Sequence, residues 1–334
     1  MPSRGAPVPV TAVRLGGRPD LPLLVLGPSL GTSAQTLWRE AARLLGERFQ
    51  VVGWDLPGHG HNRGRLGPDP VTMESLAADV LRVVDDLTGG FGGASFHYAG
   101  DSVGGAVGLQ LLLDAPERVT SATLLCTGAK IGTSEAWTDR QGVVTASGTA
   151  AMVDGSRQRW FGPGYADREP ALAGALLRAL VAADDAGYVA VCGALASFDV
   201  RDRLGEIAAP VLAVAGSDDG PTPPTTLAEI AEGVQQGRLV VLDGVGHLAP
   251  VEAPAEVARL VTELAFGPDE APEPDADPTD TPTLDARSQA LVEVAALAAL
   301  GDEDRVAARV ERAVADGVPA DDLAAARHAG AAAR

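Results

Sequence analysis

Strand-length apolar runs alternate with helix-length amphipathic segments along most of this 334-residue chain, and this alternation constrains the fold more than any other feature. The expected strands cover residues 21–27, 49–55, 95–100, 119–128, 209–216 and 237–244. The expected helices cover residues 36–47, 72–87, 103–116, 226–234 and 254–265. Strands that alternate with helices form a mostly parallel sheet with helices on both faces, so we predict an α/β fold.

Two segments interrupt this alternation. Residues 131–205, approximately, have helical patterns without a clear strand, which predicts a helical cap inserted between two strands of the sheet. Residues 267–283 contain six acidic residues and five prolines and cannot bury a core, which predicts an extended linker. The linker separates a domain at 1–266 from an alanine-rich helical segment at 284–334.

Composition excludes several classes of protein. The net charge of −19 argues against a nucleic-acid partner, because nucleic-acid binding requires a basic face. Cys126 and Cys192 have no metal-site spacing, and we expect both to be small buried residues and no metal to be bound. The sequence contains no apolar run long enough to span a membrane and no signal-peptide pattern at its start, so we expect a cytoplasmic protein with no membrane partner.

The pattern G-x-S-x-G occurs twice, at "GPSLG" (27–31) and at "GDSVG" (100–104). A nucleophilic serine on a sharp turn lies between a buried strand and the helix that follows, with small residues two positions before and after it. Ser102 meets these conditions, because an apolar strand runs into Gly100 and an apolar helix begins at Val103. Ser29 is followed by a polar, loop-like segment and is the poorer candidate for the nucleophile.

The position of "GPSLG" nevertheless suggests a role. An oxyanion hole in such a fold takes one backbone N–H from the residue after the nucleophile and a second from the loop after an early strand. We therefore predict that the N–H groups of Leu30 and Val103 form the oxyanion hole. The alternative is that "GPSLG" is a plain glycine-rich turn.

A serine nucleophile requires a histidine base that a carboxylate orients. His247 lies in a loop after the last strand of the sheet and is the candidate base. The acid is expected between serine and histidine in chain order, where "GSDDG" offers Asp218 and Asp219. We predict Asp219 from its spacing, and Asp218 remains the alternative.

These motifs resemble those of the α/β-hydrolase superfamily over residues 8–266 and, within it, the 3-oxoadipate enol-lactonase family of aromatic catabolism. The resemblance is carried by "GPSLGTS", "DLPGHGHNRG", "YAGDSVGG", "CTGAKIGTSEAWTDR", "RQRWFGPGY" and "GHLAPVEAP". It implies an α/β-hydrolase fold and hydrolysis of a small-molecule lactone through an acyl-enzyme, with no cofactor.

A lactone that carries a carboxylate requires a cation in a chain as acidic as this one. Candidates lie at the start and in the middle of the expected cap, where tryptophans would supply apolar walls. We predict these substrate-binding residues: Lys130, Trp137, Arg140, Arg159 and Trp160.

The alanine-rich segment 284–334 is expected to form about three helices, with Asp302 capping the second, Gly317 ending it and Pro319 starting the third. It resembles the helical end of 4-carboxymuconolactone decarboxylase, which some organisms fuse behind the lactonase. Only about the second half of such a domain is represented, and Arg309 stands where that family has a histidine. The resemblance thus implies a remnant without decarboxylase activity that packs on the hydrolase or on another subunit, and a homo-oligomer stays open.

Two other functions remain open from the sequence. One is an esterase or C–C bond hydrolase that uses the same three catalytic residues with a different cap pocket. The other is a binding protein that retains the fold without catalysis, which an intact set of Ser102, Asp219 and His247 argues against.

Overall fold

A computed structural model describes residues 10–268, apart from residues 65, 68, 91 and 92, together with residues 291, 294, 303–315 and 317–332. The chain divides into two compact units, Met1–Pro274 and Asp275–Arg334. The division falls inside the predicted linker 267–283, of which residues 269–283 lie outside the described residues.

The first unit is built on a seven-stranded sheet in the order β1-β3-β2-β4-β5-β6-β7. All neighbouring strands are parallel except β1, which pairs antiparallel with β3 at one edge. The strands are β1 (Thr11–Gly16), β2 (Leu23–Gly27), β3 (Gln50–Asp55), β4 (Phe96–Asp101), β5 (Val119–Leu125), β6 (Val211–Gly216) and β7 (Gly237–Leu242). The predicted mostly parallel sheet and its six expected strands are confirmed.

The edge strand β1 was not expected from the sequence. Its side chains alternate between half-buried and exposed positions, in contrast to the fully buried β2, β4 and β6. A half-exposed antiparallel strand carries a weaker apolar signal than a central parallel one.

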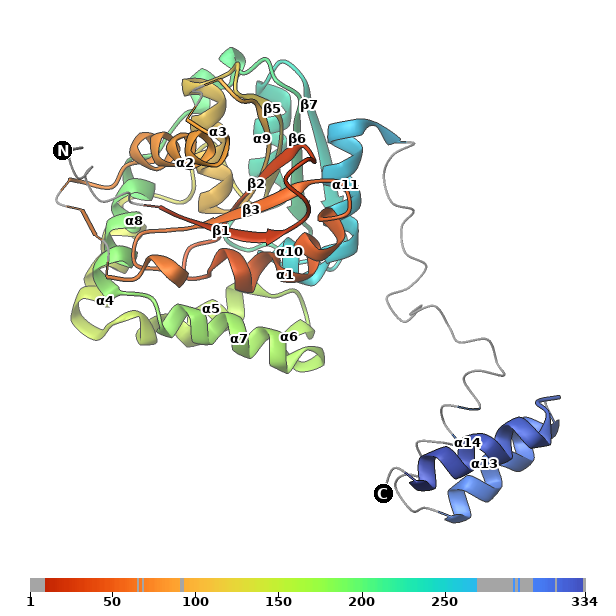
Figure 1. The fold of residues 1–334 in the computed structure, drawn as a ribbon. Helices are drawn as coiled ribbons and strands as arrows, with labels where there is room; N and C mark the ends of the chain where they lie inside the picture. Colours follow the sequence, from red (N-terminus) through yellow and green to blue (C-terminus); the bar gives the residue numbers. More distant parts are fainter. Residues whose placement is uncertain are drawn as a thin grey trace, which may run out of the picture. The chain divides into compact units, whose positions relative to one another are not determined.

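Helices cover both faces of the sheet. Figure 1 shows α2, α3 and α9 on one side, and α1 and α11 on the other. These helices are α1 (Ala34–Leu45), α2 (Met73–Leu87), α3 (Val103–Asp114), α9 (Pro224–Gly233), the short α10 (Ala249–Glu252) and α11 (Pro254–Phe266). A 3-10 turn, η1 (Gly60–Asn62), follows β3.

Side-chain capping fixes the start of α2. Thr72 and Ser75 make a reciprocal capping box, in which each side chain accepts a hydrogen bond from the other residue's backbone N–H. The apolar face of the helix is buried from Met73 to Val84, but Leu87 in the last turn is exposed.

The predicted cap between β5 and β6 is entirely helical, and none of the described residues between Leu125 and Val211 forms a strand. Its elements are α4 (Ser134–Ser147), η2 (Thr149–Met152), α5 (Val153–Trp160), α6 (Tyr165–Arg168), α7 (Pro170–Val181), α8 (Asp185–Ser197) and η3 (Arg201–Glu206). In Figure 1 the helices α4 to α7 lie together beside the sheet.

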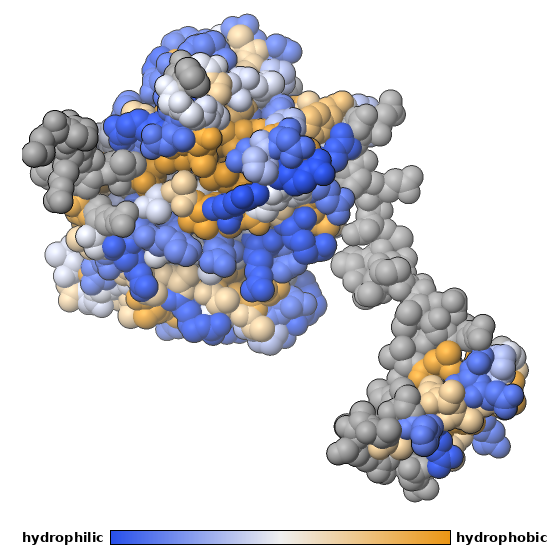
Figure 2. All heavy atoms as spheres, viewed as in Figure 1, coloured by the Kyte–Doolittle hydropathy of each residue, from blue (hydrophilic) through white to orange (hydrophobic). Residues whose placement is uncertain are grey.

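The surface of the first unit shows how its apolar residues are distributed. In the view of Figure 2 hydrophobic residues gather toward the middle of the unit, while its outer helices carry many hydrophilic residues. Within the described ranges no single helix is long and apolar enough to cross a membrane, and only α7 and α8 together match by length and composition, with a bend of 93° between them.

The second unit contains two described helices, α13 (Glu303–Ala315) and α14 (Ala320–Ala332). Gly317 has a φ angle of 86° between them, and the Val318 N–H donates to the carbonyl of Ala313, which ends α13 as predicted. The expected Asp302 cap and most of the expected first helix lie outside the described residues. The helices share a small core, made by Val294, Ala313, Val318 and Leu323.

Candidate active site

Ser102 lies on a sharp turn between β4 and α3. Its φ angle of 54° is in the left-handed region, which costs a non-glycine residue about 1–3 kcal/mol. The turn is possible because glycine flanks it: a Cβ atom on Gly100 would lie 2.4 Å from the carbonyl oxygen of Gly104. The strand and the helix predicted on either side of Ser102 are both present.

The structure brings Ser102, His247 and Asp219 together. The Nε2 atom of His247 lies 2.9 Å from Ser102 Oγ, and its Nδ1 atom lies 3.0 Å from both carboxylate oxygens of Asp219. All three side chains are buried, and they come from the ends of β4, β6 and β7. Because Nδ1–H donates to the carboxylate, Nε2 is left as an acceptor that faces the serine hydroxyl.

Asp219, rather than Asp218, contacts the histidine. Its carboxylate also accepts hydrogen bonds from the backbone N–H (2.9 Å) and the hydroxyl (2.7 Å) of Thr222. Burial opposes ionisation of this carboxyl, but the positive charge and hydrogen bond of His247, together with the Thr222 donors, hold its pKa below the usual value. Asp218 is exposed and accepts a hydrogen bond from the Ser217 hydroxyl.

The segments of the predicted oxyanion hole lie against each other. The Gly104 N–H, in the first turn of α3, donates to the Pro28 carbonyl at 2.9 Å, which joins the helix carrying Val103 to the loop carrying Leu30. Glycine is required at this contact, because a Cβ atom on Gly104 would lie 2.6 Å from the carbonyl carbon of Gly27. Leu30 lines the cavity in front of Ser102.

His59 supports this loop, a role that sequence reasoning missed. Its ring is buried, Nδ1 lies 2.8 Å from the Pro57 carbonyl, and Nε2 accepts from the Gly31 N–H at 3.2 Å. Burial lowers the pKa of His59, which favours the neutral ring that can accept this bond. The only signal in the sequence was a histidine inside a glycine-rich turn, which resembles many ordinary turns.

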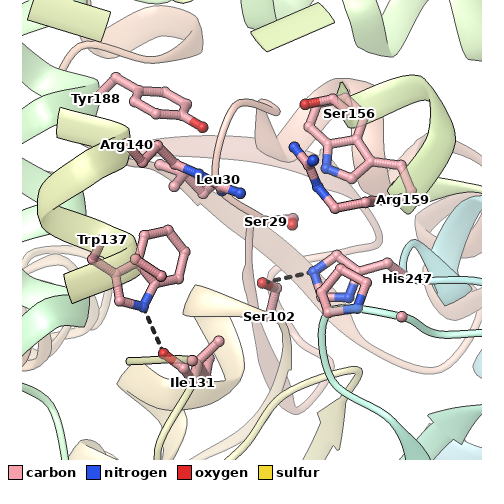
Figure 3. A pocket seen from close by; sticks show the side chains of 15 residues that line it. Ser29, Leu30, Ser102, Ile131, Trp137, Arg140, Ser156, Arg159, Tyr188 and His247 are labelled. Carbon is pink, nitrogen blue, oxygen red and sulfur yellow. Dashed lines mark hydrogen bonds between the residues drawn. The ribbon is translucent and has the colours of Figure 1, made fainter. Parts of the chain in front are cut away.

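A cavity of about 440 Å³ opens in front of Ser102 (Figure 3). The cap supplies most of its wall from α4, α5 and α8. Its lining includes Leu30, Trp137, Arg140, Ser156, Arg159, Trp160, Tyr188 and His247. Four of the five predicted substrate-binding residues are therefore in this lining.

The Arg140 and Arg159 guanidinium groups point toward the middle of the cavity from opposite sides (Figure 3). Within the described part of the chain neither forms an ion pair with a carboxylate, and Arg140 lies over the Trp137 ring at 4.8 Å. Burial and the positive charge of Arg140 both lower the pKa of Arg159. Two like charges held in one cavity create a site for an anion.

The structure does not place Lys130 in this cavity. Lys130 is not part of the cavity lining, and its ammonium group pairs with Asp199 at 3.2 Å. The next two residues, Ile131 and Gly132, do line the cavity.

Two further residues were missed. Tyr188 in α8 forms part of the cavity wall, and burial raises its pKa to about 12. Asp101, directly before Ser102, is fully buried, and neither of its carboxyl oxygens has a hydrogen-bond partner among the described residues. Burial and the negative charge of Asp219 raise the pKa of Asp101 well above its usual value, and the nearby Ser29 hydroxyl opposes this only in part.

The arrangement suits nucleophilic attack by a hydroxyl. A serine on a strained turn faces the accepting nitrogen of a histidine, whose other nitrogen a buried carboxylate holds. Among the residues that the structure describes, no group of three or more His, Cys, Asp or Glu side chains is placed to hold a metal ion.

Comparisons with known proteins agree with this fold. Residues 22–147 match the sequence model of the family described as the alpha/beta hydrolase fold. The chain is 33% identical over 241 residues to 3-oxoadipate enol-lactonase 2 of Acinetobacter baylyi, covering 71% of this chain and 86% of that protein. It is 29% identical to RutD of Azorhizobium caulinodans, a candidate carbamate hydrolase, covering 67% of this chain and 83% of that protein.

Solved structures give the same result. The enol-lactonase from Burkholderia xenovorans LB400 superposes with a TM-score of 0.71 and 29% identity, covering 77% of this chain and 96% of that one. A hydrolase from Pseudomonas aeruginosa superposes with a TM-score of 0.70, also at 29% identity. With the sheet order, the serine turn and the relative at 33% identity, these matches show that the chain belongs to the α/β-hydrolase family.

Proposed function

We propose that this hydrolase opens 3-oxoadipate enol-lactone to 3-oxoadipate, with Ser102 as nucleophile, His247 as general base and acid, and Asp219 as the carboxylate that orients it. The observation that carries the proposal is the pair of arginines, Arg140 and Arg159, in the cavity in front of Ser102. A neutral ester needs no such pair, whereas an anionic lactone does. Identity with the enol-lactonases of Acinetobacter baylyi supports the choice of lactone.

The reaction proceeds in two halves. Ser102 Oγ attacks the lactone carbonyl while its proton passes to His247 Nε2, and the N–H groups of Leu30 and Val103 stabilise the oxyanion. One such donor typically contributes about 3–4 kcal/mol to transition-state stabilisation. The ring C–O bond then breaks, His247 returns the proton to the enol oxygen, and an acyl-enzyme remains.

Water completes the reaction. His247 removes a proton from a water molecule, the resulting hydroxide attacks the acyl carbon, and Ser102 leaves with the proton that His247 returns. The free enol tautomerises to the ketone. Asp219 stays ionised throughout, because its hydrogen bonds from Thr222 and His247 favour the carboxylate.

The arginines provide the test. We expect Arg159→Gln to lower kcat/KM for enzymatically generated enol-lactone by about 10–100-fold, since a hydrogen bond to a charged group contributes about 1.5–3 kcal/mol. Cleavage of neutral p-nitrophenyl acetate should change less than twofold. Arg157→Gln is the matched control, because Arg157 lies on the same helix, is exposed and pairs with Asp167.

The measurement also separates the competing activities. Cleavage of p-nitrophenyl acetate without turnover of the lactone would favour a different ester or a C–C bond substrate. The similarity to RutD makes a carbamate the next substrate to assay. Equal losses for lactone and acetate in Arg159→Gln would refute the proposed anion site.

A further inference from the structure

Glu252 connects two segments that are distant in the sequence and adjacent at the site. Its Oε2 atom accepts a hydrogen bond from the Gly162 N–H at 2.8 Å, and its Oε1 atom accepts from the Gly246 N–H at 3.1 Å. Gly162 follows α5 in the cap, and Gly246 directly precedes His247. One carboxylate therefore holds both backbone segments.

The same two segments also contact each other directly. The His247 N–H donates to the Trp160 carbonyl at 3.0 Å, and the Leu248 N–H approaches the same oxygen at 3.3 Å. A Cβ atom on Gly246 would lie 2.5 Å from the backbone nitrogen of Gly162, so the backbones can approach this closely only where glycine is present. The short cap segment after Arg159 is thus fixed to the loop of the histidine.

We propose that Glu252 is a positioning residue that aligns the catalytic histidine with the substrate cavity by binding both backbones through its ionised carboxylate. Arg159 and Trp160 line the cavity at the end of α5, immediately before the segment that Glu252 holds. Displacement of this segment would move the cavity wall and the base together. The inference rests on the proposed role of His247.

The hydrogen bonds from Gly162 and Gly246 to Glu252 depend on pH, because the carboxyl that accepts them can be protonated. Burial raises the pKa of Glu252 to about 7, against the opposing hydrogen bonds from Gly162 and Gly246 and the positive charge of Arg168 on α6. The other titratable groups that interact with it are Asp101 on β4 and Tyr165 on α6. A protonated carboxyl carries a hydrogen on one oxygen, so it can no longer accept both N–H groups equally well.

The first test compares wild type with Glu252→Gln between pH 5.5 and 8.5, following p-nitrophenyl acetate cleavage at a wavelength that does not depend on pH. The amide resembles the protonated acid, because only one of its two terminal atoms accepts a hydrogen bond. We expect wild type to exceed the variant about tenfold in kcat/KM at pH 8.5 and to approach it at pH 5.5. Glu256→Gln, which removes a partner of Arg259 on α11, should match wild type throughout.

The outcomes separate this inference from the proposed function. Wild type that is inactive toward both the lactone and p-nitrophenyl acetate would refute the triad assignment itself. Active wild type with a wild-type-to-variant ratio that is constant across pH would refute the role of Glu252 while the triad assignment stands. A wild-type-to-variant ratio of kcat/KM that decreases as the pH is lowered from 8.5 to 5.5 would support the role. A general loss of stability would not follow the protonation of this side chain.

A second measurement needs no variant and covers the case in which Glu252→Gln does not fold. With ¹⁵N-glycine labelling, the amide proton resonances of Gly162 and Gly246 should shift together with a midpoint near pH 7. Absence of any shift at Gly162, which is remote in sequence from His247, would overturn the proposal.

Discussion

Replacing Asp101 with asparagine should stabilise the protein at neutral pH, and the gain should grow as the pH rises. Asp101 is fully buried next to Ser102, and its carboxyl has no hydrogen-bond partner among the described residues. Burial raises its pKa well above the usual 3.8, which favours the neutral carboxyl in the folded chain. In the unfolded chain the same group ionises at its usual pKa.

The sign and the size follow from proton linkage. Above pH 3.8 the unfolded state releases this proton and the folded state retains it, so rising pH favours unfolding. Each pH unit in this window costs wild type about 1.4 kcal/mol, until the pH reaches the folded pKa. Asparagine is neutral in both states and carries no such cost. The stability of Asp101→Asn relative to wild type should therefore increase with pH, by at most about 1.4 kcal/mol for each pH unit.

Urea unfolding followed by tryptophan fluorescence measures this difference. All four tryptophans, at positions 38, 54, 137 and 160, lie in the first unit, so the signal reports the hydrolase unit alone. Titrations at pH 5, 6 and 7 would give the free energy of unfolding of each protein from its midpoint and slope.

A difference between the two proteins that stays constant from pH 5 to 7 would refute the reasoning, because it would mean that Asp101 ionises alike in both states. Glu256→Gln is the control for a carboxyl whose folded pKa is lowered, here by its hydrogen bond to Arg259. Such a group is ionised in both states above pH 5. The free energy of unfolding of Glu256→Gln should therefore differ from that of wild type by the same amount from pH 5 to 7.

The remaining predictions concern the site and the second unit. Ser102→Ala should lower turnover of any substrate by about 10⁴-fold or more and abolish labelling by a fluorophosphonate, whereas equal turnover would refute its assignment as nucleophile. Asp219→Asn should lower kcat by about 10⁴-fold with little change in KM, because the amide favours the wrong tautomer of His247. Lys130→Ala should leave KM for the lactone within twofold, since Lys130 pairs with Asp199 outside the cavity. A chain ending at Gly267 should retain wild-type kcat/KM, and loss of activity in a soluble truncated chain would assign the second unit a role in the site.

The central sheet and the serine turn could be predicted because their signals are local. A buried parallel strand is a continuous apolar run of residues. The strand before Ser102 leads directly into glycines, which are needed there because backbone segments approach each other closely. The order of serine, acid and histidine along the chain then selected His247, and spacing after Gly216 selected Asp219 over its neighbour. These choices needed no information on distant contacts.

Contacts between segments far apart in the sequence could not be predicted in this way. His59 binds Gly31, 28 positions earlier, and Glu252 binds Gly162, 90 positions earlier. Lys130 lies in the segment expected to begin the cap, yet Asp199, 69 positions later, holds its ammonium group away from the cavity. The sequence placed Lys130 at the start of the cap without showing the direction in which its side chain points.

The three acidic side chains around the site show why the type of residue alone does not determine its role. Asp219 and Asp101 are buried and Glu252 is partly buried, and the three differ in the groups that surround them. Asp219 accepts from Thr222 and His247 and has a lowered pKa, Glu252 accepts from two backbone N–H groups and has a pKa of about 7, and Asp101 lacks a donor among the described residues and has a strongly raised pKa. Burial acts on all three in the same direction, so the neighbouring groups make the difference, and only Asp219 faces a histidine whose positive charge favours the carboxylate. Only the carboxyl that faces the histidine is held ionised across the whole neutral range, which is the charge distribution that an imidazolium intermediate requires.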